Sequence, residues 1–181
     1  MAFFSLASPA NKSGDIFDLK DGKSRLLMYF TLPAGDGKFL QFTRPQAIAQ
    51  ELVKHEDVIA ADYLEAQIGI PIFSAKAKLV FEATLPGAMD FFACDVHCDG
   101  QIDEFFLAKV NVYLPIIDPE RTEFRLVGSH RLIVKAAYKA ANGDDFAIAR
   151  DVDFCERLVV TDRFVEICQL SGLNIDFSRP T

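Results

Sequence analysis

The amino-acid sequence predicts an α+β fold, mostly antiparallel, with hairpins and about three helices. Three observations support this prediction. The chain contains two related strand–helix–strand units, near residues 72–92 and 159–177. Two dipeptides typical of tight hairpin turns, Asp99-Gly100 and Asn142-Gly143, separate apolar runs. Apolar residues make up 50% of the 181 residues and include 17 Phe, which is enough to form a core without disulfides.

The N-terminal third is predicted to contain short strands and one helix. The three strands are an edge strand at 3–6 and two more at 25–31 and 39–42. Pro45 fits the first turn of a helix, where its missing N–H is not needed. This helix is expected to end near His55. Its apolar stripe is formed by Ile48, Leu52 and Val53.

The two units share one order of residue types. In each, a hydroxyl residue, Ser74 or Thr161, follows an apolar pair and can cap the first turn of a helix. In each, a glycine, Gly87 or Gly172, suits the left-handed residue that commonly ends a helix. We therefore predict helices at 75–85 and 162–170 and a last strand at 174–177. The first helix is expected to pack through Leu79, Val80 and Ala83.

Between the two units the sequence predicts hairpins. Residues 89–98 form the clearest strand, because one face alternates as Phe92, Cys94, Val96 and Cys98. Asp99-Gly100 turns the chain into a long central strand, which Pro115 bends or ends. The predicted ranges that follow are this strand at 105–117, a charged turn at 118–123, and a second hairpin of 131–138 with 146–152 joined near Asn142-Gly143.

The first arm of the second hairpin has an alternative. Residues 130–139 also fit a helix, but the β-branched pair Ile133-Val134 and the Asn-Gly turn favour a strand. No linker divides the chain, so we expect one α+β domain over 1–181. Within it we distinguish an N-terminal lobe at 1–58 and a core at 59–181.

The net charge and the cysteines limit which classes of partner and which cell compartment the sequence favours. The formal charge of −7 argues against nucleic acid or an anionic membrane as the main partner, because both need clustered Lys and Arg. The same charge permits a basic protein partner. Residues 1–10 do not resemble a secretory signal, and the four cysteines follow no C-x-x-C spacing. We expect a cytoplasmic protein with four free thiols.

The most tempting chemistry lies at residues 95–106. Asp95, Asp99 and Asp103 partly match a calcium loop, but Phe106 stands where a bidentate Glu is required and the flanks are strands. These residues fit a β-hairpin with an acidic tip better. Cys94, His97 and Cys98 do not make a zinc site, because His97 points to the opposite face of the strand. We predict no catalytic residues, no metal and no cofactor.

Acidic residues gather on both predicted hairpins. Solvated turns explain such clusters, and a surface for a basic partner is the alternative, because complementary charge speeds association and selects partners. An enzyme with a dispersed Cys/His or carboxylate site is a second hypothesis for the function, because such residues come together only in the folded protein. A scaffold or adaptor that only binds other proteins is a third. The candidate partner-binding residues are Asp95, Asp99, Asp103, Glu104, Asp144 and Asp145.

Six segments of the chain carry a family resemblance: 62–64, 72–74, 89–92, 117–121, 146–150 and 158–177. Together they resemble the immunity-eleven family, small bacterial proteins encoded beside polymorphic toxins. The similarity covers about residues 60–178, with the N-terminal third fitting only loosely, and Arg121-Thr122 stands where relatives usually have Lys-Ser. The resemblance implies a cytoplasmic protein that binds and neutralises a cognate toxin, delivered by a contact-dependent or type VI secretion system. It implies no catalytic residues and transfers no binding surface, and the sequence does not identify the oligomeric state.

Overall fold

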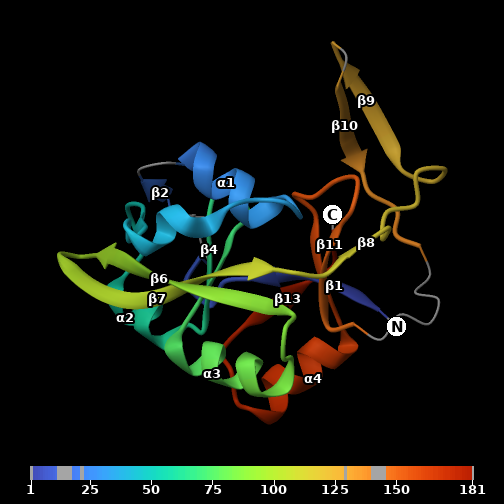
Figure 1. Ribbon diagram of the computed structural model, residues 1–181. Coiled ribbons are helices and arrows are strands. Elements are labelled where there is room, and N and C mark those ends of the chain that lie inside the picture. Colours follow the sequence, from blue (N-terminus) through green and yellow to red (C-terminus); the bar gives the residue numbers. More distant parts are fainter. Residues whose placement is uncertain (1, 12–17, 21–22, 129, 140–145, 181) are drawn as a thin grey trace.

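The computed structural model describes residues 2–11, 18–20, 23–128, 130–139 and 146–180. Within these ranges the chain forms thirteen strands, four α-helices and two short 3-10 helices, which confirms the predicted α+β class (Figure 1). Most strand pairs are antiparallel, as predicted. The helices are α1 (Lys23–Thr31), α2 (His55–Ala60), α3 (Ala75–Thr84) and α4 (Asp162–Leu170), with 3-10 turns η1 (Pro9–Asn11) and η2 (Gly37–Gln41).

Six strands form the larger sheet, in the spatial order β2-β3-β6-β7-β5-β4. They are β2 (Asp18–Lys20), β3 (Gln46–Ile48), β4 (Tyr63–Glu65), β5 (Pro71–Phe73), β6 (Met89–Cys98) and β7 (Gln101–Val110). β6 and β7 pair along their whole length, and the predicted turn joins them, with Asp99 at φ 51° and Gly100 at φ 77°. Apolar residues cover both faces of β7, with α1 on one side and α3 on the other.

Five strands form the second sheet, in the order β13-β1-β12-β11-β8. They are β1 (Phe3–Ala7), β8 (Tyr113–Leu114), β11 (Ile148–Asp151), β12 (Leu158–Thr161) and β13 (Asp176–Ser178). The first strand of the chain therefore lies inside this sheet, paired with β12 on one side and β13 on the other. The prediction of a strand at 3–6 is confirmed, but its place at an edge is wrong.

The two predicted strand–helix–strand units share a feature that their sequences do not reveal. In each unit, one strand from elsewhere in the chain lies between the two strands that the helix connects. β7 lies between β5 and β6, and β1 lies between β12 and β13. Each inserted strand is antiparallel to both neighbours. The connected strands are therefore parallel, which makes both units split βαβ motifs.

The two units pack against each other through their helices. The rings of Phe81 on α3 and Phe164 on α4 stack with centroids 4.7 Å apart, and both side chains are fully buried. Leu6, Ile148 and Val160 of the second sheet belong to the same core cluster. The helix α3 buries Ala77 and Phe81. The predicted packing is confirmed for Val80, which is half-buried against the same cluster, and is wrong for Leu79 and Ala83, which are exposed.

The N-terminal third differs most from its prediction. Residues 25–31 lie in α1, because Leu26 and Phe30 are four residues apart and bury one helical face while Met28 stays exposed. Residues 39–42 lie in or beside η2, which Asp36 caps by accepting from the Lys38 N–H. The expected helix after Pro45 is instead β3, which pairs in parallel with β6. A helix begins only at His55, where the expected one was to end.

The middle of the chain also needs two corrections. The long strand ends at Val110, and β8 follows after a break, so the predicted single strand to residue 117 is wrong. The second hairpin consists of β9 (Glu123–Val127) and β10 (His130–Lys135), which turn at Gly128 with φ 62°. β11 is fully buried and pairs in the second sheet, where both its faces are covered; an exposed hairpin could not supply that burial. Asn142-Gly143 lies outside the described residues.

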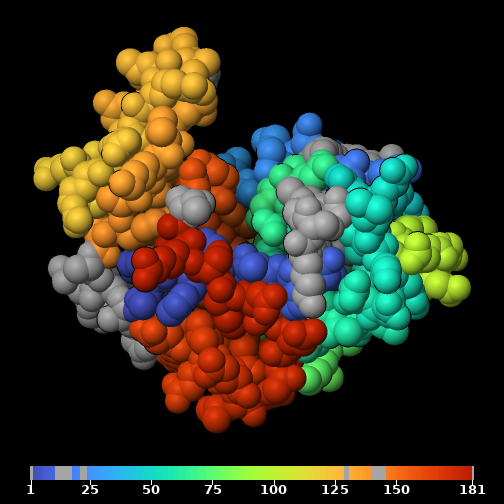
Figure 2. All heavy atoms as spheres, turned by 180° about the vertical axis from the view of Figure 1, so that it is seen from behind, coloured from blue at the N-terminus to red at the C-terminus, as the bar shows by residue number. Residues whose placement is uncertain are grey.

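The hairpin of β9 and β10 stands out from the body of the protein (Figures 1 and 2). We call residues 123–135 the β-arm. It forms a separate two-stranded sheet among the described residues. The choice of strand over helix for its second half is confirmed.

Candidate functional site

Four of the predicted partner-binding residues lie at the end of the β6–β7 hairpin, with Asp95 and Glu104 on one face and Asp103 on the other. We call Asp95, Asp99, Asp103 and Glu104 the acidic cluster. In the strand register Asp95 lies opposite Glu104 and Asp103 lies opposite Val96, while Asp99 forms the turn. The remaining two predicted residues, Asp144 and Asp145, lie outside the described residues.

Arg44 joins two members of the acidic cluster. Its Nε lies 2.8 Å from Asp95 Oδ1, and its Nη2 lies 2.5 Å from Glu104 Oε2. Carboxylates that face each other across two strands repel, and a guanidinium between them removes this repulsion. The hydrogen bond to Glu104 raises the pKa of Arg44, so the side chain stays cationic.

His55 joins the other two members. Its Nε2 lies 2.7 Å from Asp103 Oδ2, and its backbone N–H donates to Asp99 Oδ2 at 2.9 Å. His55 is the first residue of α2, so Asp99 satisfies a free donor at the start of this helix from a distant turn. The acidic tip therefore also fixes the position of α2.

Sequence reasoning missed both Arg44 and His55. One signal was present for Arg44, because a residue before proline is pushed toward extended backbone, which favours a strand over a helix start. For His55 the contact depends on a turn 44 positions away in the chain, and local sequence carries no sign of it.

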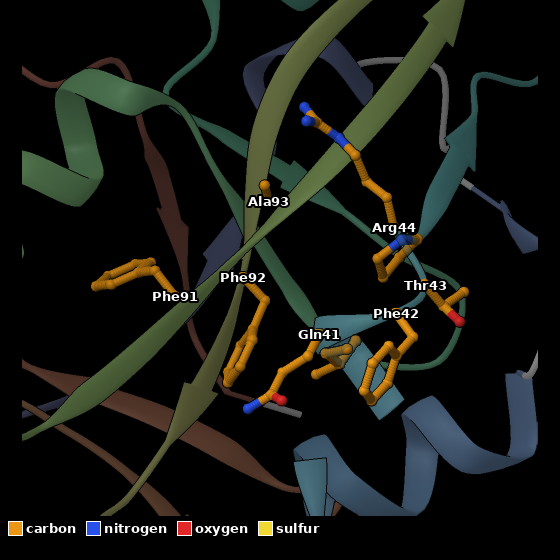
Figure 3. A pocket seen from close by; sticks show the side chains of 9 residues that line it. Gln41, Phe42, Thr43, Arg44, Phe91, Phe92 and Ala93 are labelled. Carbon is orange, nitrogen blue, oxygen red and sulfur yellow. The ribbon is translucent and has the colours of Figure 1, made fainter. Parts of the chain in front are cut away.

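A shallow groove lies beside the acidic cluster, with a volume of about 430 Å³. Figure 3 shows Gln41, Phe42 and Phe92 around one part of it, while the guanidinium of Arg44 extends along β6 past Ala93. Phe42 is 86% exposed, which is unusual for a large aromatic residue. The groove thus places an apolar ring next to a set of charges. Its lining residues are Leu40, Gln41, Phe42, Thr43, Arg44, Pro45, Phe91, Phe92 and Ala93.

The thiols of this region are not activated. Cys98 is buried, and burial raises its pKa, with Asp99 and Asp103 adding to the effect. A nucleophilic cysteine needs the opposite shift. Burial raises the pKa of Cys94 to about 12. Both side chains face the core, as predicted. Across the part of the chain that the structure describes, no three His, Cys, Asp or Glu side chains converge as a metal site would require.

The predicted structural residues behave differently from one another. Ser74 caps α3 by accepting from the Ala77 N–H at 3.1 Å. Thr161 occupies the cap position of α4, but its hydroxyl donates to the Phe146 carbonyl at 2.8 Å, so its predicted capping bond is wrong. Gly87 and Gly172 both have positive φ, at 78° and 60°, as a helix stop requires.

Two charged residues that sequence reasoning did not single out organise the second sheet. Arg150 is fully buried and donates to the carbonyls of Cys155 and Gly69, each at 2.9 Å. The carboxylate of Asp151 accepts four backbone N–H groups. Its donors are Ile116, Ile117, Asp153 and Phe154. Both side chains hold loops in place.

None of the helices in the described ranges has the length and apolar character needed to cross a membrane. No curated protein matches the chain. The family model of the Immunity protein family (Imm11) matches residues 4–156, which include the N-terminal third that resembles the family only loosely by its motifs. Since the match spans most of the 181 residues, this chain belongs to the Imm11 immunity protein family.

Proposed function

We propose that this protein binds a cognate toxin domain and neutralises it in the cytoplasm of the producing cell. Membership of the Imm11 family is the observation that supports the proposal, because an immunity protein needs a toxin to act on. Neutralisation by binding requires no catalytic residue. The toxin reaches neighbouring cells through a contact-dependent or type VI secretion system in this proposal.

The acidic cluster is the proposed contact for a basic surface on the toxin. Arg44 pairs with two of its four carboxylates, and the other two bind His55, so the cluster keeps a net negative charge even with Arg44 in place. Surface charge of this kind raises association rates and selects oppositely charged partners. The exposed ring of Phe42 beside it supplies apolar area that charge alone lacks. Asp144 and Asp145 stay in the proposal as further acidic contacts.

The direct test is co-expression with the toxin encoded beside this chain's gene. We expect the two proteins to purify together, and cells that express the toxin to grow only when this chain is present. A toxin with an inactivated active site serves as the control for binding without toxicity. A toxin that neither binds this chain nor loses toxicity in its presence contradicts the proposal.

A further inference from the structure

The β-arm exposes apolar side chains without covering them. The most exposed are Leu126 at 71% and Val134 at 63%, with Val127 and Leu132 about half exposed. Leu126 and Val127 are consecutive residues of β9, so they point to opposite faces of the hairpin. Leu132 lies opposite Arg125 in the register. Apolar residues therefore occupy both faces.

An isolated two-stranded hairpin is only marginally stable in water, so this one depends on its base. The Thr122 hydroxyl accepts from the Ala137 N–H at 3.0 Å, and the Asp118 N–H donates to the Ala137 carbonyl at 2.8 Å. The ring of Phe124 stacks on Phe154 with centroids 5.6 Å apart. Asp151 in turn holds the backbone of Phe154. The body thus presents the β-arm in a fixed position.

The charge of the β-arm is opposite to that of the protein. It contains three basic residues and one acidic residue, a formal charge of +2, so the other residues of the −7 chain carry −9. Arg125 and Arg131 lie in the two facing strands, and Arg131 also covers the Phe124 ring at 5.5 Å. Figures 1 and 2 place the β-arm and the tip of β6–β7 at opposite ends of the molecule.

A second copy of the chain fits these features poorly. Two β-arms that paired edge to edge would bring six basic residues together and leave both sheet faces exposed. A β-arm that bound the acidic cluster of another copy would form a head-to-tail contact, which builds rings or open chains of molecules instead of a two-fold dimer. A flat partner surface would cover one face only. A cleft covers both.

We propose that the β-arm inserts into a cleft of the toxin domain that has apolar walls and an acidic rim. This inference rests on the proposed function and adds a second contact to it, at the end of the molecule away from the acidic cluster. Apolar walls cover Leu126 on one face and Val127 and Leu132 on the other, and carboxylates at the rim pair with the basic residues. Because the base of the β-arm is fixed, binding loses little conformational freedom.

Paired substitutions test the inference. Leu126→Asp and Arg125→Glu change the β-arm, and Leu170→Asp and Arg179→Glu make the same changes at exposed positions of α4 and the C-terminal segment. All four side chains are exposed, so we expect unfolding midpoints close to that of the unchanged protein. Titration calorimetry with the purified, catalytically inactivated toxin measures the affinity. We expect each β-arm variant to weaken binding by at least about tenfold, and each control by less than about twofold.

The outcomes separate the inference from the function on which it rests. An unchanged protein that binds toxin, with β-arm variants that bind equally well, overturns the inference and leaves the function intact. Absence of any binding to the unchanged protein overturns both. If Leu126→Asp weakens toxin binding but the effect of Arg125→Glu on affinity does not shrink at high salt, the cleft has no acidic rim and this part of the inference is overturned. If sedimentation shows that the unchanged protein self-associates and that the β-arm variants do not, the β-arm binds a second copy of the chain. This result also overturns the inference.

Discussion

Asp62 connects the two split units through a single buried carboxylate. One oxygen accepts from the hydroxyl of Ser74, the cap of α3, and the other accepts from the Asn174 N–H at 2.8 Å, just after α4. The backbone of Asp62 adds two further bonds, to Ser74 and Asn174. Because the Asp62 carboxylate accepts from donors of both units, a single substitution at this position affects both units.

We expect Asp62→Ala to lower the free energy of unfolding by about 2–4 kcal/mol and Ser74→Ala by about 1 kcal/mol. The double variant should lose less than the sum of the two, because they share one hydrogen bond. Urea denaturation measures all three. Asp57→Ala, at an exposed carboxylate in α2, is the control, and an Asp62→Ala loss no larger than the control's contradicts this role.

Ser74 and Thr161 show where prediction from sequence stops at the residue scale. Both were recognised as cap positions, because a hydroxyl before an amphipathic run is a local pattern. Only Ser74 makes the capping bond. Thr161 lies in a strand next to the Phe146 carbonyl, and this acceptor 15 positions away takes its hydroxyl instead. The choice between two acceptors depends on tertiary contacts that no local pattern encodes.

At the scale of elements, β6 and the turn after it were predicted to the residue and β7 only over 105–110, while α1 and β3 were not predicted. The hairpin has alternating faces, a left-handed turn dipeptide and consecutive partners, all of which are local. β3 has three residues, and its partner β6 lies about fifty positions later in the chain. For the same reason the acidic cluster could be predicted as a group, but its contacts with Arg44 and His55 could not.

The ion pairs of the acidic cluster permit a test with two variants. Both variants lose an ion pair, but they change the charge of the cluster in opposite directions. Glu104→Gln and Arg44→Gln both break the Arg44–Glu104 ion pair, and Arg44→Gln also breaks the pair with Asp95. Glu104→Gln lowers the negative charge of the cluster, and Arg44→Gln raises it. If the cluster attracts a basic toxin, Glu104→Gln slows association and Arg44→Gln speeds it, each by about two- to tenfold at low salt.

Stopped-flow association rates at about 20 mM and about 500 mM salt measure this effect, and the difference should shrink at high salt. Rates that change in the same direction in both variants point to structure alone and contradict the proposed contact. Charge reversal of all four carboxylates is a poorer test, because it also removes the bonds that position α2.

At the scale of the whole molecule, buried thiols in both main core clusters link stability to pH. Burial raises the pKa of Cys94 to about 12 and that of Cys168 to about 12, from an ordinary value of 9.0. Burial also raises the pKa of Tyr29, Tyr113 and Tyr138. The folded protein therefore keeps protons that the unfolded chain releases.

Stability should fall as pH rises from about 9 toward 12, by up to about 1.4 kcal/mol per pH unit for each thiol. Urea denaturation at about pH 8 and about pH 10.5, with reductant present, measures the loss. In Cys94→Ala the free energy of unfolding should fall less steeply with pH, because unfolding of this variant releases close to one proton fewer. If the stability of the variant and that of the unchanged protein fall equally with pH, Cys94 does not cause the loss.

The division predicted from sequence, a lobe at 1–58 and a core at 59–181, stays a prediction. The structure does place β1, from the first of these ranges, among strands from the second. The main core cluster around Phe81 and Phe164 also contains Leu6. The early and late parts of the chain thus complete one another's sheets.

The position of β1 between β12 and β13 sets the timing of folding during synthesis. Phe3 pairs with Thr161, and Leu6 pairs with Phe177, so the first strand waits for nearly the last residues before it gains either neighbour. A ribosome that adds about 5–20 residues per second needs roughly 10–35 s to make this chain. For most of that interval Phe3, Phe4 and Leu6 have no sheet to join. The strand β1 therefore stays without its neighbours until the residues of β12 and β13 have been made.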